Sequence, residues 1–216
     1  MTATSPSDTV TSLEQLDALY ADPTPRSLAK ESPIVTPLYA ELIAAAPFAI
    51  LATHGPKGID CSPRGDVPGF VQVLDERTLL LPDRRGNNRL DTLRNLLHHP
   101  AIALLFMVPG VGETVRVRGT ATISTAEDLR ARFEVSGVLP ATVLTVDVER
   151  VYFQCQRALA RSRLWDPERY AARSTLPTAG QLQVEAGAMT AQRAVEYDAD
   201  LDEYVASTLY DGPSRP

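Results

Sequence analysis

The chain has 216 residues, 44% of them hydrophobic, and a formal net charge of -6, which suits one domain with additions or two small domains. The negative charge argues against a general nucleic-acid surface, and two cysteines are too few for a disulfide scaffold. The polar start carries no secretory signal, and the longest apolar runs are too short to cross a membrane. We therefore expect a soluble cytoplasmic protein with no nucleic-acid or membrane partner.

The N-terminal part is predicted to be helical after a disordered tail, residues 1–11. Ser12 precedes a stripe of leucines, which predicts a capped helix. Thr36 followed by Pro37 predicts the start of another helix, with a cap and then proline in the first turn. Residues 12–47 are therefore predicted to form an N-terminal helical segment.

Strand-like patterns begin at Phe48, where short apolar or alternating runs are separated by turn residues. The predicted strands are residues 48–53, 59–62, 70–74, 78–81, 101–108, 114–124 and 142–153. Because most strands follow one another without a helix between them, the pattern predicts a mostly β fold, an antiparallel barrel rather than a Rossmann fold. Residues 48–165 are assigned to the barrel domain and residues 166–216 to a helical C-terminal extension, with a last helix at 197–210.

The stretch 82–89, just before a predicted helix, is the most informative for function. Asn87 or Asn88 can cap that helix, and its first backbone N–H groups favour an anion. Guanidinium groups that suit a phosphate come from Arg84, Arg85 and Arg89. A capped surface helix with solvated arginines is the alternative, and the residues alone leave both interpretations open.

Two further stretches carry basic residues. Residues 62–70 place Arg64 and Asp66 among two glycines and two prolines, and taken alone they favour a tight turn with a local Arg–Asp pair. Arg157 and Arg161 are four residues apart, so a helix would put both on one face, where they could hold an anion. A solvated basic face is the alternative interpretation for this second pair.

Other motifs give no catalytic residue. His98 and His99 are adjacent rather than four residues apart, so no metal site is predicted. No Gly-x-Ser-x-Gly elbow is present. Cys61 and Cys155 can be nucleophiles, but buried thiols are the commoner case and are expected here.

The order of the motifs along the chain carries a family resemblance. The segments concerned are residues 48–53, 62–66, 68–70, 82–83, 86–95, 104–106, 109–110, 113–119 and 161–165. Together they resemble the pyridoxamine-phosphate-oxidase-like, FMN-dependent proteins of bacteria. The resemblance covers residues 12–210.

The resemblance implies a split β-barrel, antiparallel and Greek-key-like, and a homodimer that binds FMN at the subunit interface. It implies that basic residues from a strand and from the loop entering the next helix hold the flavin phosphate. Further contacts would come from a later strand and from the segment after the barrel. Carried over, the cofactor-binding residues are Arg64, Asn87, Asn88, Arg89, Thr114, Arg116, Arg157 and Arg161.

The sequence departs from pyridoxamine-phosphate oxidase itself. The usual arginine–lysine pair of the phosphate-binding strand and the C-terminal tryptophan–arginine segment are not recognisable, which argues against vitamin B6 synthesis. The expected function is flavin-mediated hydride transfer with a small substrate, with NAD(P)H as candidate reductant. The alternatives are a flavin carrier without turnover, or a member of the same fold that binds the deazaflavin F420 or haem.

Overall fold

The computed structural model describes residues 8–210. Its contacts divide the chain into two units, residues 1–31 and 32–216, which are described separately. The first unit contains α1 (Leu13–Asp17) and α2 (Pro25–Ala29). The side chain of Ser12 accepts a hydrogen bond from the backbone N–H of Gln15, which confirms the predicted cap. Residues 1–7, most of the predicted disordered tail, lie outside the described residues.

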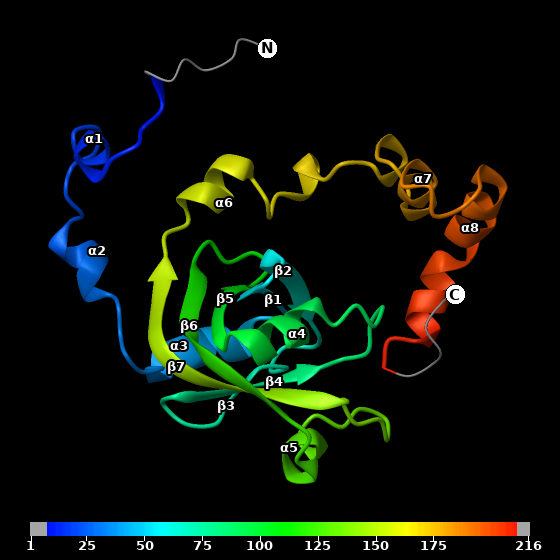
Figure 1. Ribbon diagram of the computed structural model, residues 1–216, viewed down its shortest axis with the longest axis horizontal. Coiled ribbons are helices and arrows are strands. Elements are labelled where there is room, and N and C mark those ends of the chain that lie inside the picture. The colour runs from blue at the N-terminus through cyan, green and yellow to red at the C-terminus, as the bar shows by residue number, and fades with distance from the viewer. Residues whose placement is uncertain (1–7, 211–216) are drawn as a thin grey trace. The chain divides into compact units, whose positions relative to one another are not determined.

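The second unit is built on one antiparallel sheet (Figure 1). Its strands are β1 (Phe48–Gly55), β2 (Gly58–Gly65), β3 (Gln72–Val73), β4 (Thr78–Asp83), β5 (Ala101–Met107), β6 (Thr114–Ser124) and β7 (Thr142–Gln154). They are hydrogen-bonded in the order β2-β1-β5-β6-β7-β4-β3. Each neighbouring pair is antiparallel. The expected fold, a mostly β split barrel with flanking helices, is confirmed.

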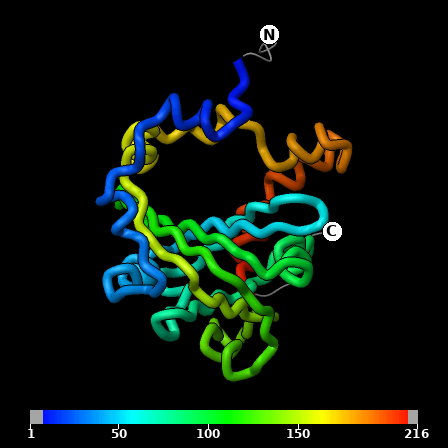
Figure 2. The backbone as a smooth tube through the Cα atoms, turned by 60° about the vertical axis from the view of Figure 1, so that its left-hand side comes forward, coloured from blue at the N-terminus to red at the C-terminus, as the bar shows by residue number. Residues whose placement is uncertain are grey.

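Helices flank the sheet and extend the chain beyond it. They are α3 (Pro37–Ala45), α4 (Asp91–His98), α5 (Glu127–Ala131), α6 (Arg157–Ser162), α7 (Ala179–Glu185) and α8 (Ala191–Ser207), with short 3-10 helices η2 (Pro167–Arg169) and η3 (Arg173–Thr175). Helix α4 contacts the hairpin of β1 and β2, beside which it lies in Figure 2. Helices α7 and α8 pack against each other. The predicted boundaries 12–47, 48–165 and 166–216 stay a prediction.

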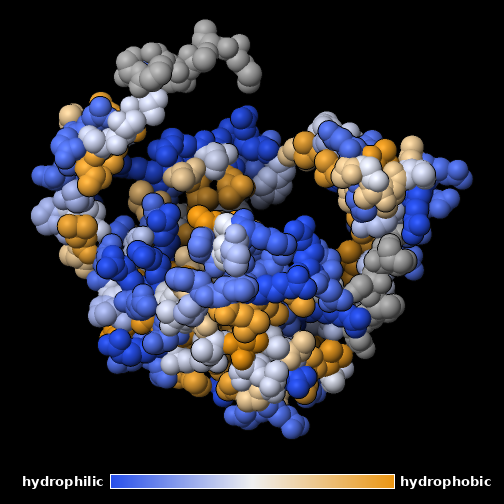
Figure 3. All heavy atoms as spheres, viewed as in Figure 1, coloured by the Kyte–Doolittle hydropathy of each residue, from blue (hydrophilic) through white to orange (hydrophobic). Residues whose placement is uncertain are grey.

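Alternating side chains explain why these residues form a two-faced sheet. In β6, Val115 and Val117 are buried while Arg116 and Arg118 are exposed, as the sequence pattern predicts. The buried face packs on a main core that includes Leu51 and other apolar residues of β1, β4, β5, β6 and β7, and a smaller cluster forms around Leu80, Phe133 and Val143. On the face of the molecule seen in Figure 3, hydrophilic residues cover much of the barrel, with apolar residues between them.

A bulge interrupts the pairing of the two longest strands. The register of β6 on β7 shifts between Arg118 and Gly119. Gly119 packs so closely on the backbone carbonyl oxygen of Asp147 that a Cβ atom would overlap it. Such bulges bend and twist a strand, and this one separates residues 150–154 of β7, whose only partner strand is β6, from residues 142–147, which also pair with β4.

Candidate functional site

Two crossed ion pairs join the ends of β2 and β4, which lie near opposite ends of the strand order. The Nη1 atom of Arg64 lies 2.7 Å from Oδ1 of Asp83, the last residue of β4. Directly after these strands, Nε of Arg84 lies 2.9 Å from Oδ2 of Asp66. We call this junction, formed by Arg64, Asp66, Asp83 and Arg84, the seam. Side chains join the barrel here, since β2 and β4 are not neighbours in the sheet.

The predicted local pair between Arg64 and Asp66 is wrong. Residues two apart in an extended strand are separated by roughly 6.6 Å along the chain, and their side chains lean the same way. Both side chains therefore meet opposite charges from the β4 end instead of each other. The two ion pairs therefore link the motif at residues 62–70 to the motif at residues 82–89.

A cavity of about 980 Å³ lies at the seam, a size within the range of small-molecule and cofactor sites. It is lined by β2, the end of β4, the loop before α4 and the first turn of that helix. Four of the predicted cofactor-binding residues line it together: Arg64, Asn87, Asn88 and Arg89. We call these four residues the cavity set.

Arg64 carries a hydrogen-bond donor that lacks an acceptor. Its Nε atom is buried and has no partner among the described residues, while Nη1 is used by Asp83. A guanidinium group offers five N–H donors, and a buried donor without an acceptor destabilises the folded state. A ligand with several acceptor oxygens, such as a phosphate monoester, fits this side chain.

The loop entering α4 differs from the predicted asparagine cap. Leu90 occupies the N-cap position without a side-chain hydrogen bond, so the cap predicted at Asn87 or Asn88 is wrong. The Oδ1 atom of Asn87 instead accepts a hydrogen bond of 3.2 Å from the N–H of Arg89, a local turn typical of asparagine. Asn88 and Leu90 both have positive φ. The first turn of α4 consequently lacks a side-chain cap and retains N–H groups that favour an anion.

Carboxylates accompany the arginines around the cavity. The lining residues include four arginines and three aspartates, namely Arg64, Arg84, Arg85, Arg89, Asp60, Asp83 and Asp91. Arg89 has a side chain that is 76% exposed and pairs with Asp91 at 2.8 Å. The charges of the lining residues largely cancel. An anion would therefore be bound by hydrogen-bond donors at fixed positions more than by a large positive charge.

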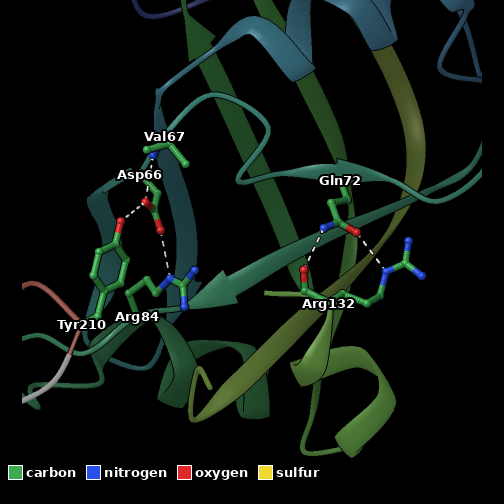
Figure 4. Close-up of polar contacts among 6 residues, drawn as sticks. All are labelled: Asp66, Val67, Gln72, Arg84, Arg132 and Tyr210. Atoms are coloured by element: carbon green, nitrogen blue, oxygen red, sulfur yellow. Dashed lines mark hydrogen bonds and ion pairs between the residues drawn. The ribbon is translucent and has the colours of Figure 1, made fainter. Parts of the chain in front are cut away.

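The C-terminal extension reaches the cavity through Tyr210 (Figure 4). Its hydroxyl donates a 2.5 Å hydrogen bond to Oδ1 of Asp66, which also accepts from the N–H of Val67. The guanidinium carbon of Arg84 lies 5.1 Å from the centre of the Tyr210 ring, within cation–π range. Sequence reasoning missed Tyr210, because no local motif marks a residue that pairs 144 positions away.

These contacts fix the charge of the cluster. Burial would raise the pKa of Asp66, but hydrogen bonds from Tyr210, the Val67 N–H and Arg84 outweigh it and hold that pKa below its usual value. The hydrogen bond to Asp66 raises the pKa of Tyr210. Near neutral pH, Asp66 is therefore a carboxylate and Tyr210 a neutral donor.

The predicted residues of β6 lie on the other face of the sheet. Arg64 pairs with Ala49, which pairs with Phe106, which in turn pairs with Val115. Directly opposite residues point to one face, so Arg64 shares the inner face with buried Val115. Thr114 and Arg116, on either side of Val115, point to the outer face.

The predicted arginine pair after the barrel is also outside the cavity. Arg157 and Arg161 both lie in α6, four residues apart as predicted, and both are exposed. Neither lines the cavity. We call Thr114, Arg116, Arg157 and Arg161 the outer set, because one chain does not bring them to the cavity set.

The remaining candidate groups give no second site. Cys61 and Cys155 are both exposed, so the expectation of buried thiols is wrong. Among residues 8–210, His, Cys, Asp and Glu side chains form no cluster of three or more that could hold a metal ion. Within the same residues, no helix has the length and apolar character needed to cross a membrane.

Solved structures show similarity at low sequence identity. HupZ from Group A Streptococcus is 22% identical with a TM-score of 0.47, over 56% of this chain and 94% of that chain. General Stress Protein 26 from Bacillus anthracis is 13% identical with a TM-score of 0.41, over 52% and 88%. An FMN-binding protein from Syntrophomonas wolfei is 12% identical with a TM-score of 0.42, over 53% and 82%.

The family comparison is decisive where single structures are not. No curated protein matches the sequence. The family described as pyridoxamine 5'-phosphate oxidase matches residues 35–155, which include the whole sheet and all four residues of the seam. This match extends over more than half of the chain. The chain therefore belongs to the pyridoxamine 5'-phosphate oxidase family.

Proposed function

We propose that the cavity at the seam binds the phosphate of FMN and that the protein is an FMN-dependent oxidoreductase. The observation that carries the proposal is the buried Nε donor of Arg64, without an acceptor, at a cavity of about 980 Å³. Family membership supports it independently, because the family is named for an oxidase. When bound, the flavin supplies hydride-transfer chemistry and the protein supplies position and access.

The cavity set would hold the phosphate. Arg64 would donate from its guanidinium group, and the backbone N–H groups at the start of α4 would add the dipole of that helix. Arg89 would contribute from the exposed side of the loop. The substrate would be a small organic molecule, with NAD(P)H as the reductant to be tested first.

We further propose a homodimer with FMN at the subunit interface. The outer set does not line the cavity of its own chain, so a second copy is needed if both sets are to contact one flavin. The cytoplasmic location expected from the sequence stays a prediction.

Other cofactors of the fold make different demands on the cavity. Haem needs an axial ligand; none of His54, His98 and His99 lines this cavity, whereas Cys61 and Tyr210 do, and a Soret band in the spectrum below would identify haem. The deazaflavin F420 and FMN ask for similar phosphate contacts, and a flavin carrier would bind FMN without turnover. Those two alternatives are separated by the test below.

The test is an absorbance spectrum of the purified protein before and after excess FMN and desalting. We expect a retained flavin band near ~450 nm at about one FMN per chain, a property of the cofactor, and oxidation of NAD(P)H when a small acceptor is supplied. A band near ~420 nm would show that the bound cofactor is F420 instead of FMN. Bound FMN without turnover of any donor would indicate a carrier. Absence of any retained chromophore would contradict the proposal.

A further inference from the structure

The C-terminal extension touches the seam at a point that matters for anion binding. Tyr210 follows α8 and donates a hydrogen bond from its hydroxyl to Asp66, whose side chain is only 4% exposed. Asp66 in turn accepts from Nε of Arg84 at 2.9 Å. The three residues thus form a chain of contacts that runs from the extension to a guanidinium group lining the cavity.

Arg84 is restrained from two sides. Its Nε atom is held by Asp66, and its guanidinium plane lies over the ring of Tyr210 at 5.1 Å. The Nη groups make no hydrogen bond to the described residues, so they stay available at the cavity. A side chain held in this way loses less conformational freedom when it binds an anion than a free arginine does.

We propose that Tyr210 is a positioning residue for phosphate binding, acting through Asp66 and Arg84. The proposal rests on the proposed function, since it deepens the account of how the cavity holds FMN. Tyr210 orients Asp66 by its hydroxyl and supports Arg84 by its ring. Arg84 then presents its Nη groups to the phosphate, and the extension becomes part of the binding site of its own chain.

The experiment compares FMN with riboflavin, which has the same ring system but no phosphate. Tyr210→Phe keeps the aromatic ring and removes only the hydroxyl bond to Asp66. We expect it to weaken FMN binding about tenfold, in the range of a lost charged hydrogen bond, while riboflavin affinity changes by less than about twofold. Tyr170→Phe is the matched control, because Tyr170 is 61% exposed in the same extension and does not line the cavity.

A double-mutant cycle identifies the route of the effect. Arg84→Ala alone should weaken FMN binding by roughly 10- to 100-fold, since it removes a charge-assisted contact. In the Arg84→Ala background, Tyr210→Phe should have little further effect on FMN affinity, because its action passes through the missing side chain. Full additivity of the two changes would overturn the proposed route.

The outcomes separate this proposal from the proposed function. If the wild-type chain binds FMN and Tyr210→Phe binds it equally well, the positioning role is wrong and FMN binding stands. If FMN and riboflavin weaken by the same factor, Tyr210 only shapes the cavity, and the proposal is again wrong. If the wild-type chain binds no FMN, the proposed function fails and takes this proposal with it.

Discussion

The barrel is held together in two different ways on its two sides. From β2 through β4, each strand is joined to its neighbour by backbone hydrogen bonds, and β1, β5, β6, β7 and β4 share a main core. At the seam, where that pairing does not continue, ion pairs join β2 to β4. The residues that close the barrel there also line the cavity, so one set of charges contributes both to the fold and to a binding site.

The two sides are expected to contribute unequally to stability. Burial of apolar surface is the largest favourable term in folding, and the wall of β1, β5, β6 and β7 carries most of it. Partly buried ion pairs contribute little net stability, because desolvation offsets much of their attraction. Changes in the wall should therefore act on folding, and changes at the seam should act mainly on ligand binding.

The largest expected effect comes from the wall. Leu51 lies in β1 and is 0% exposed, so Leu51→Ala leaves a cavity that its neighbours fill only in part. We expect a loss of about 2–5 kcal/mol in the free energy of unfolding, measured by urea denaturation. Leu97→Ala is the control, since Leu97 is 78% exposed and should change stability by less than about 0.5 kcal/mol. Equal losses for the two variants would contradict the comparison.

The next largest effect is expected at the seam. Arg64→Ala should weaken FMN binding by about 2–3 kcal/mol, because it removes charge-assisted donors from the cavity. Arg89→Ala should cost about 1 kcal/mol or less, since that side chain is 76% exposed and solvent screens its charge. Fluorescence titration with FMN measures both values. Arg118→Ala, on the exposed face of β6, serves as the control, and an Arg89→Ala effect larger than that of Arg64→Ala would reverse the assignment.

The smallest effect concerns the attachment of the extension and its pH dependence. The pKa of Asp66 lies below its ordinary value of 3.8, so the stability it contributes is present above that pH and is lost as pH falls through the lower folded-state value. The pKa of Tyr210 lies above 10.0, so its contribution is present below pH 10.0 and is lost as pH rises through the raised value.

Hydrogen exchange at residues 208–210, followed across pH, measures this attachment after correction for the intrinsic exchange rate. We expect protection to fall at both extremes in the wild-type chain. In Tyr210→Phe, the alkaline loss should disappear because the titrating hydroxyl is absent. An unchanged alkaline limb in that variant would show that another group controls the attachment.

Local structure could be predicted from the sequence where a single strand shows alternating apolar and polar residues. Residues 114–124 are a strand with the predicted bounds, because alternation of apolar and polar side chains is a local property. The last helix was predicted at 197–210 but spans Ala191–Ser207, where Thr190 caps its start. The consequence is functional, because Tyr210 lies beyond the helix and is able to reach Asp66.

The ion-pair partners of Arg64 and Asp66 could not be predicted in the same way. Arg64 and Asp66 are close in sequence, yet each pairs with a residue near the end of β4. These pairings depend on the strand order, because only the folded barrel brings the end of β2 close to the end of β4. The cavity set follows from the family resemblance and the phosphate argument. Arg84 is a phosphate candidate from its sequence position alone, but its contacts with Asp66 and Tyr210 are visible only in the structure.

The bulge at Gly119 affects the geometry of the seam, although Gly119 is not one of the seam residues. Because no methyl group stands between Gly119 and the carbonyl oxygen of Asp147, β6 and β7 can bend closely over each other. Beyond that bend, β7 pairs with β4 and sets Asp83 opposite Thr142. The curvature that brings a carboxylate within reach of Arg64 therefore depends on the smallest residue of the opposite wall, so a position that does not line the cavity helps to set the geometry of the binding site.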